Sequence, residues 1–391
     1  MKKVYIIMLA ISAFIVFYAM VGYPLFLKLL GKIKKPKPNQ IRTDYEPTVS
    51  YMIVAHNEET VIKDKLENAI GLDYPKEKLQ ILVASDNSTD STNSIVNTFI
   101  EEHKQFHIKL YCSKEHKGKT NAQNEAQKLV QSEILVMTDA NTLLEKDAIR
   151  QLVSYFTSDD IVYVCGKLEY SNSGDNCTSN SESTYWNLDL YMRDIESRIK
   201  SITAGNGALY AIRNKEYIDF DPIYCHDSIM PFTYGKMGKR ALFNPKATAY
   251  EKAGENNGEE YKRKVRMNRD LLDMLSWGFS VSNPFRYGWF SIFYFGHRTC
   301  RYLIWLAHIV MIIATIGLTA MGSKIGALLT IAQIIFFAIS WMSIHHKIQF
   351  RSSLLRFCFY YGMTVLAQIH GVINIITGKA KPVWEKAEST R

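Results

Sequence analysis

Two side chains with hard oxygen atoms follow a short apolar run near the middle of the chain. The run Ile134–Met137 is followed by Thr138, Asp139, Ala140 and Asn141. Such a run is typical of a buried strand, and in open α/β sheets ligands bind at the carboxyl ends of the strands. The carboxylate of Asp139 and the amide oxygen of Asn141 could together bind one divalent cation. An ordinary turn is the alternative, because Asp and Asn are common turn residues.

Three other predicted strands also end in polar clusters. These are AHNEE at 55–59, SDNSTD at 85–90 and HKGKTNAQN at 116–124. Helix capping alone could explain any one of them. Together with Asp139 and the glycine-separated pair Lys117 and Lys119, they indicate one nucleotide site, because a diphosphate needs a cation and basic groups. The chain has no GxxxxGK[ST] motif and no GxGxxG after the first strand, so neither a P-loop nor a dinucleotide fold is favoured.

The strands and helices that would position these clusters alternate along residues 45–280. Apolar segments with strand character are Val49–Ala55, Ile81–Ser85, Ile108–Cys112, Ile134–Thr138 and Val162–Gly166. Helical segments such as Glu59–Ala69 and Ser91–Glu102 separate them, and a further helix is expected over Glu259–Trp277. This alternation predicts an α/β domain with a mostly parallel, Rossmann-like sheet covered by helices on both faces. The polar stretch 171–183 is predicted to be a loop.

Four apolar stretches are long enough to cross a membrane. They are Val4–Leu27, Tyr302–Met321, Ile325–Ile344 and Phe357–Ile376. The first, within residues 1–30, is interpreted as an N-terminal transmembrane anchor rather than a cleaved signal peptide, because no small-residue cleavage site is evident. The lysines that follow it predict that this flank is cytoplasmic.

The region after residue 280 is predicted to lie on and in the membrane. Residues 281–301 are rich in aromatic side chains, which suits an interfacial amphipathic segment. Residues 302–378 are predicted to form about three transmembrane helices, followed by a tail at 379–391. The last apolar stretch contains Gln368 and His370, and it could be re-entrant or face other helices. If it crosses, the basic tail would lie outside against the charge rule, and this point stays open.

The chain carries 47 Lys and Arg residues against 38 Asp and Glu residues, a formal net charge of +9. A basic balance is compatible with nucleic acid, anionic lipid or phosphate ligands. The aromatic residues gather in the predicted membrane region, which argues against nucleic-acid binding by the soluble domain. The six cysteines are scattered without a CxxC spacing, and we expect them to be reduced, with no zinc site and no disulfide.

Seven segments together give the chain a family resemblance. They are VAHNEE at 54–59, SDNSTDST at 85–92, GKTNAQN at 118–124, TDAN at 138–141, GNGALYAIR at 205–213, HD at 226–227 and RKVRM at 263–267. With these motifs the chain resembles the membrane-bound, inverting family-2 glycosyltransferases, which include cellulose, hyaluronan and poly-N-acetylglucosamine synthases. The resemblance implies a GT-A type nucleotide-diphospho-sugar transferase domain joined to transmembrane helices.

The resemblance also implies a UDP-sugar donor. His56, Glu58 and Asp86 stand at the positions that hold the uridine in this family. Lys119 stands where the family has a lysine near the pyrophosphate.

The metal and a second basic group are implied in the same way. The family's DxD motif is similar to the segment that holds Asp139 and Asn141, so these two residues are expected to bind Mg²⁺ or Mn²⁺. Arg263 and Arg266 lie where the family carries QxxRW over the pyrophosphate, although the glutamine and the tryptophan are replaced here. A basic helix that faces lipid is the alternative for this segment.

The family's general base is the last acid of an ED or DD pair, which here implies Asp227. Inversion needs a hydroxyl that attacks the anomeric carbon opposite the leaving diphosphate, and a carboxylate can take its proton. Gly205, Asn206 and Gly207 stand in the family's acceptor region, where glycine permits close approach of the backbone to a ligand. His226 replaces the preceding acid and could tune Asp227 or the acceptor pocket.

These inferences lead to a hexosyltransferase-type enzyme on the cytoplasmic face of the inner (plasma) membrane. It would move a sugar from a UDP-sugar, with inversion, onto a lipid-linked saccharide or a growing polysaccharide. A processive synthase that also translocates its polymer is an alternative, and four spans are few for a channel, so a homo-oligomer or an export partner would then be needed. A catalytically inactive membrane scaffold of an envelope assembly is the other alternative.

Overall fold

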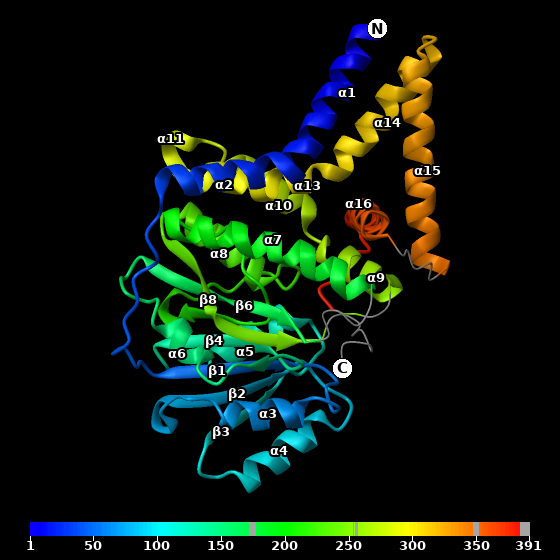
Figure 1. Ribbon diagram of the computed structural model, residues 1–391. Helices are drawn as coiled ribbons and strands as arrows, with labels where there is room; N and C mark the ends of the chain where they lie inside the picture. The colour runs from blue at the N-terminus through cyan, green and yellow to red at the C-terminus, as the bar shows by residue number, and fades with distance from the viewer. Residues whose placement is uncertain (172–176, 253, 255–256, 347–351, 384–391) are drawn as a thin grey trace. The chain divides into compact units, whose positions relative to one another are not determined.

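The computed structural model describes residues 1–171, 177–252, 254, 257–346 and 352–383. Its internal contacts divide the chain into two compact units, which are described separately (Figure 1). The helical unit comprises Met1–Lys35, Gly174–Leu188 and Gly254–Ala380. The sheet unit comprises Pro36–Ser173, Asp189–Ala253 and Lys381–Arg391.

The sheet unit is built on eight strands in the order β3-β2-β1-β4-β7-β6-β8-β5. Their bounds are β1 Val49–Ala55, β2 Leu79–Ser85, β3 His107–Cys112, β4 Ile134–Asp139, β5 Leu143–Leu144, β6 Ile161–Tyr170, β7 Tyr210–Arg213 and β8 Arg240–Glu251. The first four in this order are parallel, as the sequence predicts. The other half is mixed, because β7 is antiparallel to β4 and β6, β5 is antiparallel to β8, and only β6 and β8 are parallel.

The register of the central strands brings their carboxyl ends to one edge. Ala55 at the end of β1 lies beside Ser85 at the end of β2, and Val54 lies beside Asp139 at the end of β4. Strand β7 runs the other way and begins at Tyr210, next to the end of β4. The segment before β7 therefore reaches the same edge as the segments after β1, β2 and β4. Both central strands, β1 and β4, are almost wholly buried, as continuous apolar runs predict.

Helices of the sheet unit connect the strands. They are α3 Ile62–Ile70, η2 Lys76–Lys78, α4 Thr92–Glu102, α5 Lys119–Gln127, α6 Ala148–Val153, η3 Asn214–Glu216, α8 His226–Lys236 and the second half of α7 Cys177–Ile199. The helices predicted over Glu59–Ala69 and Ser91–Glu102 are confirmed as α3 and α4. The prediction of a loop over residues 171–183 is wrong for most of the residues in it that the structure describes. Residues 172–176 lie outside the described residues, and from Cys177 onward the chain is helical.

The helical unit holds the remaining elements. They are α1 Lys2–Phe17, the π-helical turn η1 Tyr18–Gly22, α2 Tyr23–Lys34, α9 Asn257–Met267, α10 Leu271–Ser280, α11 Pro284–Tyr287, α12 Trp289–Tyr294, η4 Phe295–Thr299, α13 Cys300–Tyr302, α14 Ile304–Ala320, α15 Lys324–His346 and α16 Ser353–Ile376. The single helix predicted over Glu259–Trp277 is wrong, because α9 ends before α10 begins. The side chain of Asn268 donates a hydrogen bond to the carbonyl of Lys264 (2.7 Å), a local contact that competes with continued helix.

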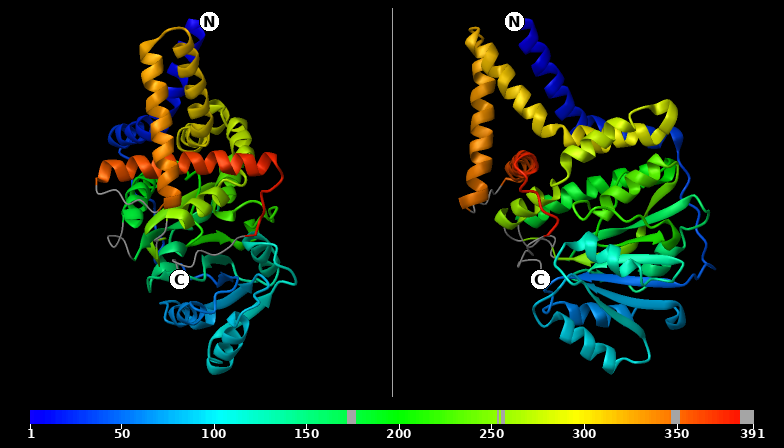
Figure 2. Two further views of the ribbon diagram at one scale, coloured as in Figure 1. Left: turned by 90° about the vertical axis from the view of Figure 1, so that its right-hand side faces the viewer. Right: turned by 180° about the vertical axis from the view of Figure 1, so that it is seen from behind.

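Among the described residues of this unit, three helices are long and apolar enough to cross a membrane, judged by length and composition: Lys2–Lys34, Lys324–His345 and Cys358–Ile376. A fourth candidate is the pair Trp289–Tyr302 and Ile304–Ala320, which is bent by 55°. Figure 2 shows α16 lying across α15 rather than alongside it.

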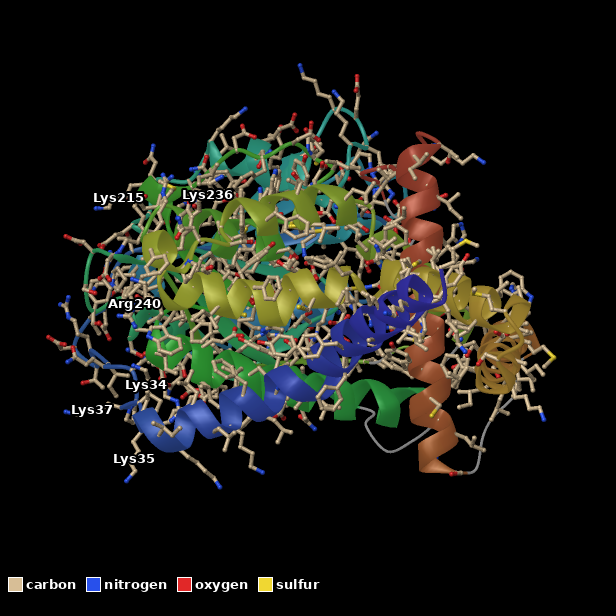
Figure 3. The ribbon with its side chains drawn as sticks, turned by 90° about the horizontal axis from the view of Figure 1, so that it is seen from above. Lys34, Lys35, Lys37, Lys215, Lys236 and Arg240 are labelled. Atoms are coloured by element: carbon tan, nitrogen blue, oxygen red, sulfur yellow. The ribbon has the colours of Figure 1, made fainter. Side chains whose placement is uncertain are left out.

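Close helix packing and aromatic anchoring mark the start of this unit. A Cβ at Gly317 of α14 would lie 2.5 Å from the ring of Tyr5 on α1, so the glycine lets the two helices touch. At the end of α2, the ammonium of Lys34 lies over the ring of Trp289, 4.7 Å from its centroid. Lys35 ends the helix with a φ of 44°, and Figure 3 shows both lysines at this end of α2. Basic and aromatic side chains in contact are typical of a membrane interface.

Candidate active site

Three charged side chains meet beside Gly207 at the carboxyl edge of the sheet, at a point called the gap below. Lys119 begins α5, Asp139 ends β4, and Asp227 lies in the first turn of α8. If Gly207 carried a Cβ, that atom would meet all three. It would lie 2.9 Å from Nζ of Lys119, 3.4 Å from Oδ2 of Asp139 and 3.9 Å from Cγ of Asp227. The structure thus brings together three residues that the sequence singles out, and a side chain at position 207 would be too close to Lys119.

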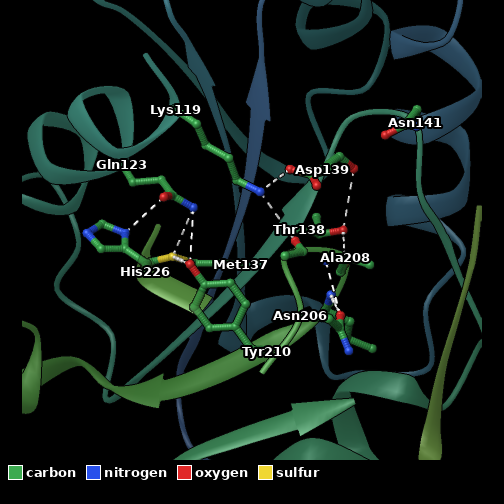
Figure 4. Close-up of polar contacts among 12 residues, drawn as sticks. Lys119, Gln123, Met137, Thr138, Asp139, Asn141, Asn206, Ala208, Tyr210 and His226 are labelled. Atoms are coloured by element: carbon green, nitrogen blue, oxygen red, sulfur yellow. Dashed lines mark hydrogen bonds and ion pairs between the residues drawn. The ribbon is translucent and has the colours of Figure 1, made fainter. Parts of the chain in front are cut away.

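The charges in this gap perturb one another. Lys119 forms an ion pair with Asp139 (Figure 4). Burial lowers the pKa of Lys119, but the carboxylates of Asp139 and Asp227 outweigh burial, so the net shift is upward. Burial raises the pKa of Asp227; Lys119 opposes this shift and Asp139 adds to it. The lysine therefore stays charged between two acids, and one of them binds its proton more tightly than an ordinary aspartate.

Asn141 does not join this group. Its side-chain nitrogen donates a hydrogen bond to Oε1 of Glu251 (2.9 Å), and in Figure 4 no dashed line joins Asn141 to Asp139. Of the two residues predicted to bind a cation, only Asp139 lies at the gap. A metal role for Asn141 stays a prediction.

The glycine-containing segment before β7 is shaped by its own side chain and backbone. The amide oxygen of Asn206, a buried residue, accepts a hydrogen bond from the backbone N–H of Ala208 (3.1 Å). The N–H of Gly205 donates to the carbonyl of Asp227 (2.7 Å), which fastens this segment to the start of α8. Gly205 and Asn206 therefore hold the segment in place, while Gly207 faces the gap.

A buried hydrogen-bond network supports the start of α8. His226 is 2% exposed, and its Nδ1 lies 2.9 Å from Oε1 of Gln123. The amide nitrogen of Gln123 donates to the hydroxyl of Tyr210 (3.2 Å) and to the sulfur of Met137 (3.4 Å), as Figure 4 shows. Burial lowers the pKa of His226 to about 3, so the imidazole is neutral near pH 7. The network locks the helix turn that presents Asp227.

The loop that leads into α5 is held by one buried carboxylate. Asp86 is fully buried and accepts hydrogen bonds from the N–H groups of Lys117 (3.1 Å) and Gly118 (2.8 Å). Nδ1 of His116 lies 2.8 Å from the same carboxylate. Asp86 thus fixes the loop that positions Lys119.

Glycine is required in this loop. Gly118 has a φ of 99°, a conformation that residues with a side chain rarely adopt. A Cβ at this position would also lie 2.6 Å from the carbonyl oxygen of Pro382, in the tail segment that belongs to the sheet unit. The tail therefore packs directly on the residue before Lys119.

The end of β1 contributes a flat aromatic pair. The rings of His56 and His116 stack with centroids 3.7 Å apart and an interplanar angle of 11°. Nδ1 of His56 lies 2.7 Å from the backbone oxygen of Asp86. Glu58 is 4% exposed, and its N–H donates to the hydroxyl of Thr92 (2.8 Å).

The ligand atoms of His56, Asp86 and His116 lie within 4.8 Å of one another, as in some metal sites. Two histidines that share one ion need lone pairs that converge on it. Stacked rings keep their lone pairs in parallel planes, and both Nδ1 atoms already face oxygen atoms of Asp86. The geometry favours a platform for a flat group over a metal centre.

Two of the predicted donor-binding residues belong to the other unit. Arg263 and Arg266 lie on α9, and Arg263 forms two hydrogen bonds with the carboxylate of Glu260, at 2.6 Å and 2.9 Å. Their contact with a diphosphate stays a prediction.

Three residues near the gap have no assigned role in the sequence analysis. Gln123 lies four positions after Lys119 on α5, a spacing that places both on one helix face and could have revealed it. His116 stands within a motif that the sequence singles out, but its ring contact depends on a distant strand. The third, Lys65 on α3, is fully buried beneath β4. No local pattern identifies it, because a lysine at a buried helix position looks like a surface residue in the sequence.

The whole chain has the fold of a known structure. The mannosyltransferase PcManGT from Pyrobaculum calidifontis, solved in complex with GDP-Man and Mn²⁺, matches it with a TM-score of 0.72 and 20% sequence identity. The match covers 95% of this chain and 99% of that chain. The fold and the site together define a GT-A-like glycosyltransferase architecture with a curled, mixed α/β sheet.

Sequence comparison names the family. Residues 50–219 match the model described as Glycosyl transferase family 2, so the chain carries a family 2 glycosyltransferase domain. The chain is 37% identical over 131 residues to the probable glycosyltransferase YdaM of Bacillus subtilis (strain 168), covering 32% of this chain and 31% of that protein. It is 29% identical over 163 residues to the beta-monoglucosyldiacylglycerol synthase of Synechocystis sp., covering 42% and 33%. The matches span about a third of the length of these relatives. The family 2 glycosyltransferase domain expected from the motifs is confirmed over residues 50–219.

Gly207→Ala is expected to lower turnover roughly 10- to 100-fold, because displacing a reacting group by about 1 Å can have an effect of that size. The new Cβ would meet the mobile end of Lys119, so the free energy of unfolding should change by less than about 1 kcal/mol. Turnover and thermal unfolding are measured on the same preparation. Gly254→Ala is the matched control, because nothing lies within 4 Å of its added Cβ. Normal turnover in Gly207→Ala would show that the gap does not hold the reacting groups.

Proposed function

We propose that this protein transfers a sugar from a nucleotide-diphosphate sugar, with inversion, onto a lipid-linked acceptor at a membrane. The observation that carries the proposal is the meeting of Lys119, Asp139 and Asp227 beside Gly207. A base, a fixed cation and a carboxylate that can hold a divalent cation are the groups that such a transfer needs. The similarity to a beta-monoglucosyldiacylglycerol synthase supports a lipid acceptor.

In this proposal Asp227 acts as the general base. The acceptor hydroxyl attacks the anomeric carbon from the side opposite the diphosphate, and its proton passes to the Asp227 carboxylate. The bond between the anomeric carbon and the diphosphate oxygen breaks, and the nucleoside diphosphate leaves with the electron pair. Lys119 lies on the same gap, where its charge stabilises the negative charge that develops on the leaving group.

A divalent cation fits the residues at this gap. Asp139 places one part-exposed carboxylate there, and Mg²⁺ or Mn²⁺ is commonly held by one or two carboxylates together with substrate phosphates. When bound, the cation would supply charge neutralisation at the diphosphate. Asp139 is the residue that would hold it, and Lys119 would pair with the remaining phosphate charge.

The nucleoside would lie against the His56 and His116 platform, with Glu58 and Asp86 beneath it. Stacked imidazole rings offer a flat surface to a base. The sequence motifs favour a uridine nucleotide, whereas the matching structure contains a guanosine nucleotide, so both classes belong in a test.

The helical unit would be embedded in the inner (plasma) membrane with the transferase domain in the cytoplasm. The apolar helices and the basic, aromatic end of α2 support this placement. Because α16 lies across α15, we favour a crossing by α14 and α15 as a hairpin, with α16 along the membrane surface. The basic residues Lys379 and Lys381 would then stay on the cytoplasmic side, in agreement with the charge rule.

A processive synthase that exports its polymer is the second candidate. It would need a channel, and the helical unit offers three candidate spans or up to four in the described part of the chain. A partner or a second copy would have to supply the rest of such a channel. An inactive scaffold is disfavoured by the intact charged group at Gly207.

The deciding experiment measures nucleoside-diphosphate release by the full chain in detergent. A panel of UDP- and GDP-sugars is tested with Mn²⁺, with Mg²⁺ and with EDTA, in the presence of lipid extract as acceptor, and product length is determined. Cation-dependent release with one donor class and a product one sugar longer is the expected result. Long products would favour the processive synthase, and absence of both release and nucleotide binding would contradict the proposal.

As the pH is lowered, activity is expected to fall at a pH above the one at which an ordinary aspartate becomes protonated. Burial raises the pKa of Asp227; Lys119 opposes this shift and Asp139 adds to it, and the protonated carboxyl cannot accept a proton. Lowering the pH through this raised pKa therefore removes the base. The profile of kcat/KM against pH gives the position of this limb, and Asp227→Glu should move it. A flat profile down to pH 4 would contradict a base with a raised pKa.

A further inference from the structure

A fully buried lysine lies beneath the segment that carries Asp139. Lys65 of α3 is 0% exposed, and its ammonium donates a hydrogen bond to Oγ1 of Thr138 (3.0 Å) and another to the carbonyl of Thr142. It also lies over the ring of Tyr51, 5.4 Å from the centroid. The two hydrogen-bond acceptors stand on either side of Asp139 in the sequence. Lys65 therefore binds the segment 138–142 at both ends.

Among the described residues, this lysine has no acidic partner in contact. Within the part of the chain that the structure describes, no carboxylate lies within ion-pair distance of Lys65, although Asp139 and Glu251 are close enough to act on its charge. Burial without such a partner lowers the pKa of Lys65 to about 7, and Asp139 and Glu251 only partly oppose this shift. Groups in this position are often found where function requires them.

The contacts of Lys65 continue to the other side of the gap. The Thr138 hydroxyl that accepts from Lys65 donates in turn to the carbonyl of Ala208 (2.7 Å), next to Gly207. A chain of two hydrogen bonds thus joins α3, the end of β4 and the segment before β7. The positions of Asp139 and Gly207 are therefore both tied to one buried ammonium.

We propose that Lys65 is a positioning residue that holds Asp139 and the Gly207 segment in the arrangement that binds a nucleoside diphosphate with a divalent cation. The inference rests on the proposed function and adds a residue that does not touch the donor. Lys65 acts through Thr138, so the two residues form one unit.

The test uses the full chain in detergent and compares Lys65→Met with the unaltered protein. Methionine keeps a long side chain without the charge, and replacing a buried ion by an apolar residue is often neutral for stability. Calorimetry gives the dissociation constants of UDP and of GDP with Mn²⁺ and with EDTA. For each nucleotide, the ratio of the affinity with Mn²⁺ to the affinity with EDTA is expected to fall about tenfold in Lys65→Met. A loss of this size lies within the range seen for groups that orient metal ligands. A merely structural role would lower both affinities alike and leave the ratio unchanged.

A second variant tests the same unit without touching the lysine. Thr138→Val removes the hydroxyl and should lower the ratio to a similar extent, whereas Thr138→Ser keeps the hydroxyl and should preserve it. In the double variant of Lys65→Met and Thr138→Val, the ratio should fall no further than in either single variant, because the effects of coupled residues are non-additive. If Lys65→Met does not fold, the comparison of the valine and serine variants decides.

The outcomes separate this inference from the proposed function. An unchanged ratio in folded Lys65→Met, or in Thr138→Val, would overturn the role of Lys65 alone. Additive losses in the double variant would also overturn it. Absence of Mn²⁺-dependent binding of both nucleotides by the unaltered protein would overturn the proposed function, and the inference with it.

Discussion

Asp227→Asn is expected to lower turnover by about three orders of magnitude, within the 10²- to 10⁴-fold range of general-base catalysis. Asparagine has the same shape as aspartate but cannot accept the proton of the acceptor hydroxyl. The N–H of Gly205 bonds to the backbone carbonyl of this residue, so the loop should keep its form. Affinity for the nucleoside diphosphate should therefore change little.

Turnover at saturating donor and calorimetric binding of the nucleoside diphosphate are the two measurements. Asp159→Asn is the control, because it makes the same chemical change at an exposed aspartate. Turnover close to that of the unaltered protein would assign the base to another residue. Loss of binding together with turnover would show that Asp227 holds the donor instead.

Asp139→Ala is expected to weaken cation-dependent nucleotide binding about 100-fold, as the loss of roughly two charge-assisted contacts would do. The variant removes the carboxylate at the gap that can hold the cation. Lys119 keeps the nearby charge of Asp227, so it should remain protonated and the fold should survive.

Asn141→Ala is the matched comparison for this variant. Its side chain already bonds to Glu251, so the loss of cation-dependent binding in Asn141→Ala should be at least tenfold smaller than in Asp139→Ala. Binding with Mn²⁺ and with EDTA is measured for both. Equal losses in the two variants would mean that Asn141 turns toward the cation in the complex, and an unchanged Mn²⁺ dependence in Asp139→Ala would remove the metal assignment.

The parallel half of the sheet could be predicted from the sequence because its signals are local. The strands β1 and β4 are continuous apolar runs, and each ends where its polar cluster begins. Parallel strands present their ends at one edge, so Asp139 and the residues after β1 and β2 could be expected together. The predicted meeting of Lys119, Asp139 and Asp227 came instead from the family resemblance, since no local pattern joins residues so far apart.

The parts that could not be predicted depend on partners distant in sequence. Asn141 donates a hydrogen bond to Glu251, which lies 110 positions later in the sequence. Lys65 is buried because Thr138 and Thr142 accept its hydrogen bonds, and helical spacing alone would place a lysine outside. The stretch from Cys177 reads as a loop because its polar residues resemble a turn, yet it forms the start of a long helix. In each case tertiary contacts override the local preference.

The close fit of Tyr5 against Gly317 has a consequence for how the chain is made. If α1 and α14 cross the membrane as we propose, the first helix leaves the ribosome some three hundred residues before α14 and would enter the bilayer as an independent segment. Helix α14 is synthesised later and has Gly317 at the contact, where any larger residue would meet the ring of Tyr5. A bulky residue in place of Gly317 should leave synthesis of the transferase domain intact but impair the late packing of α14 against α1. Such a defect would appear as normal insertion followed by rapid degradation.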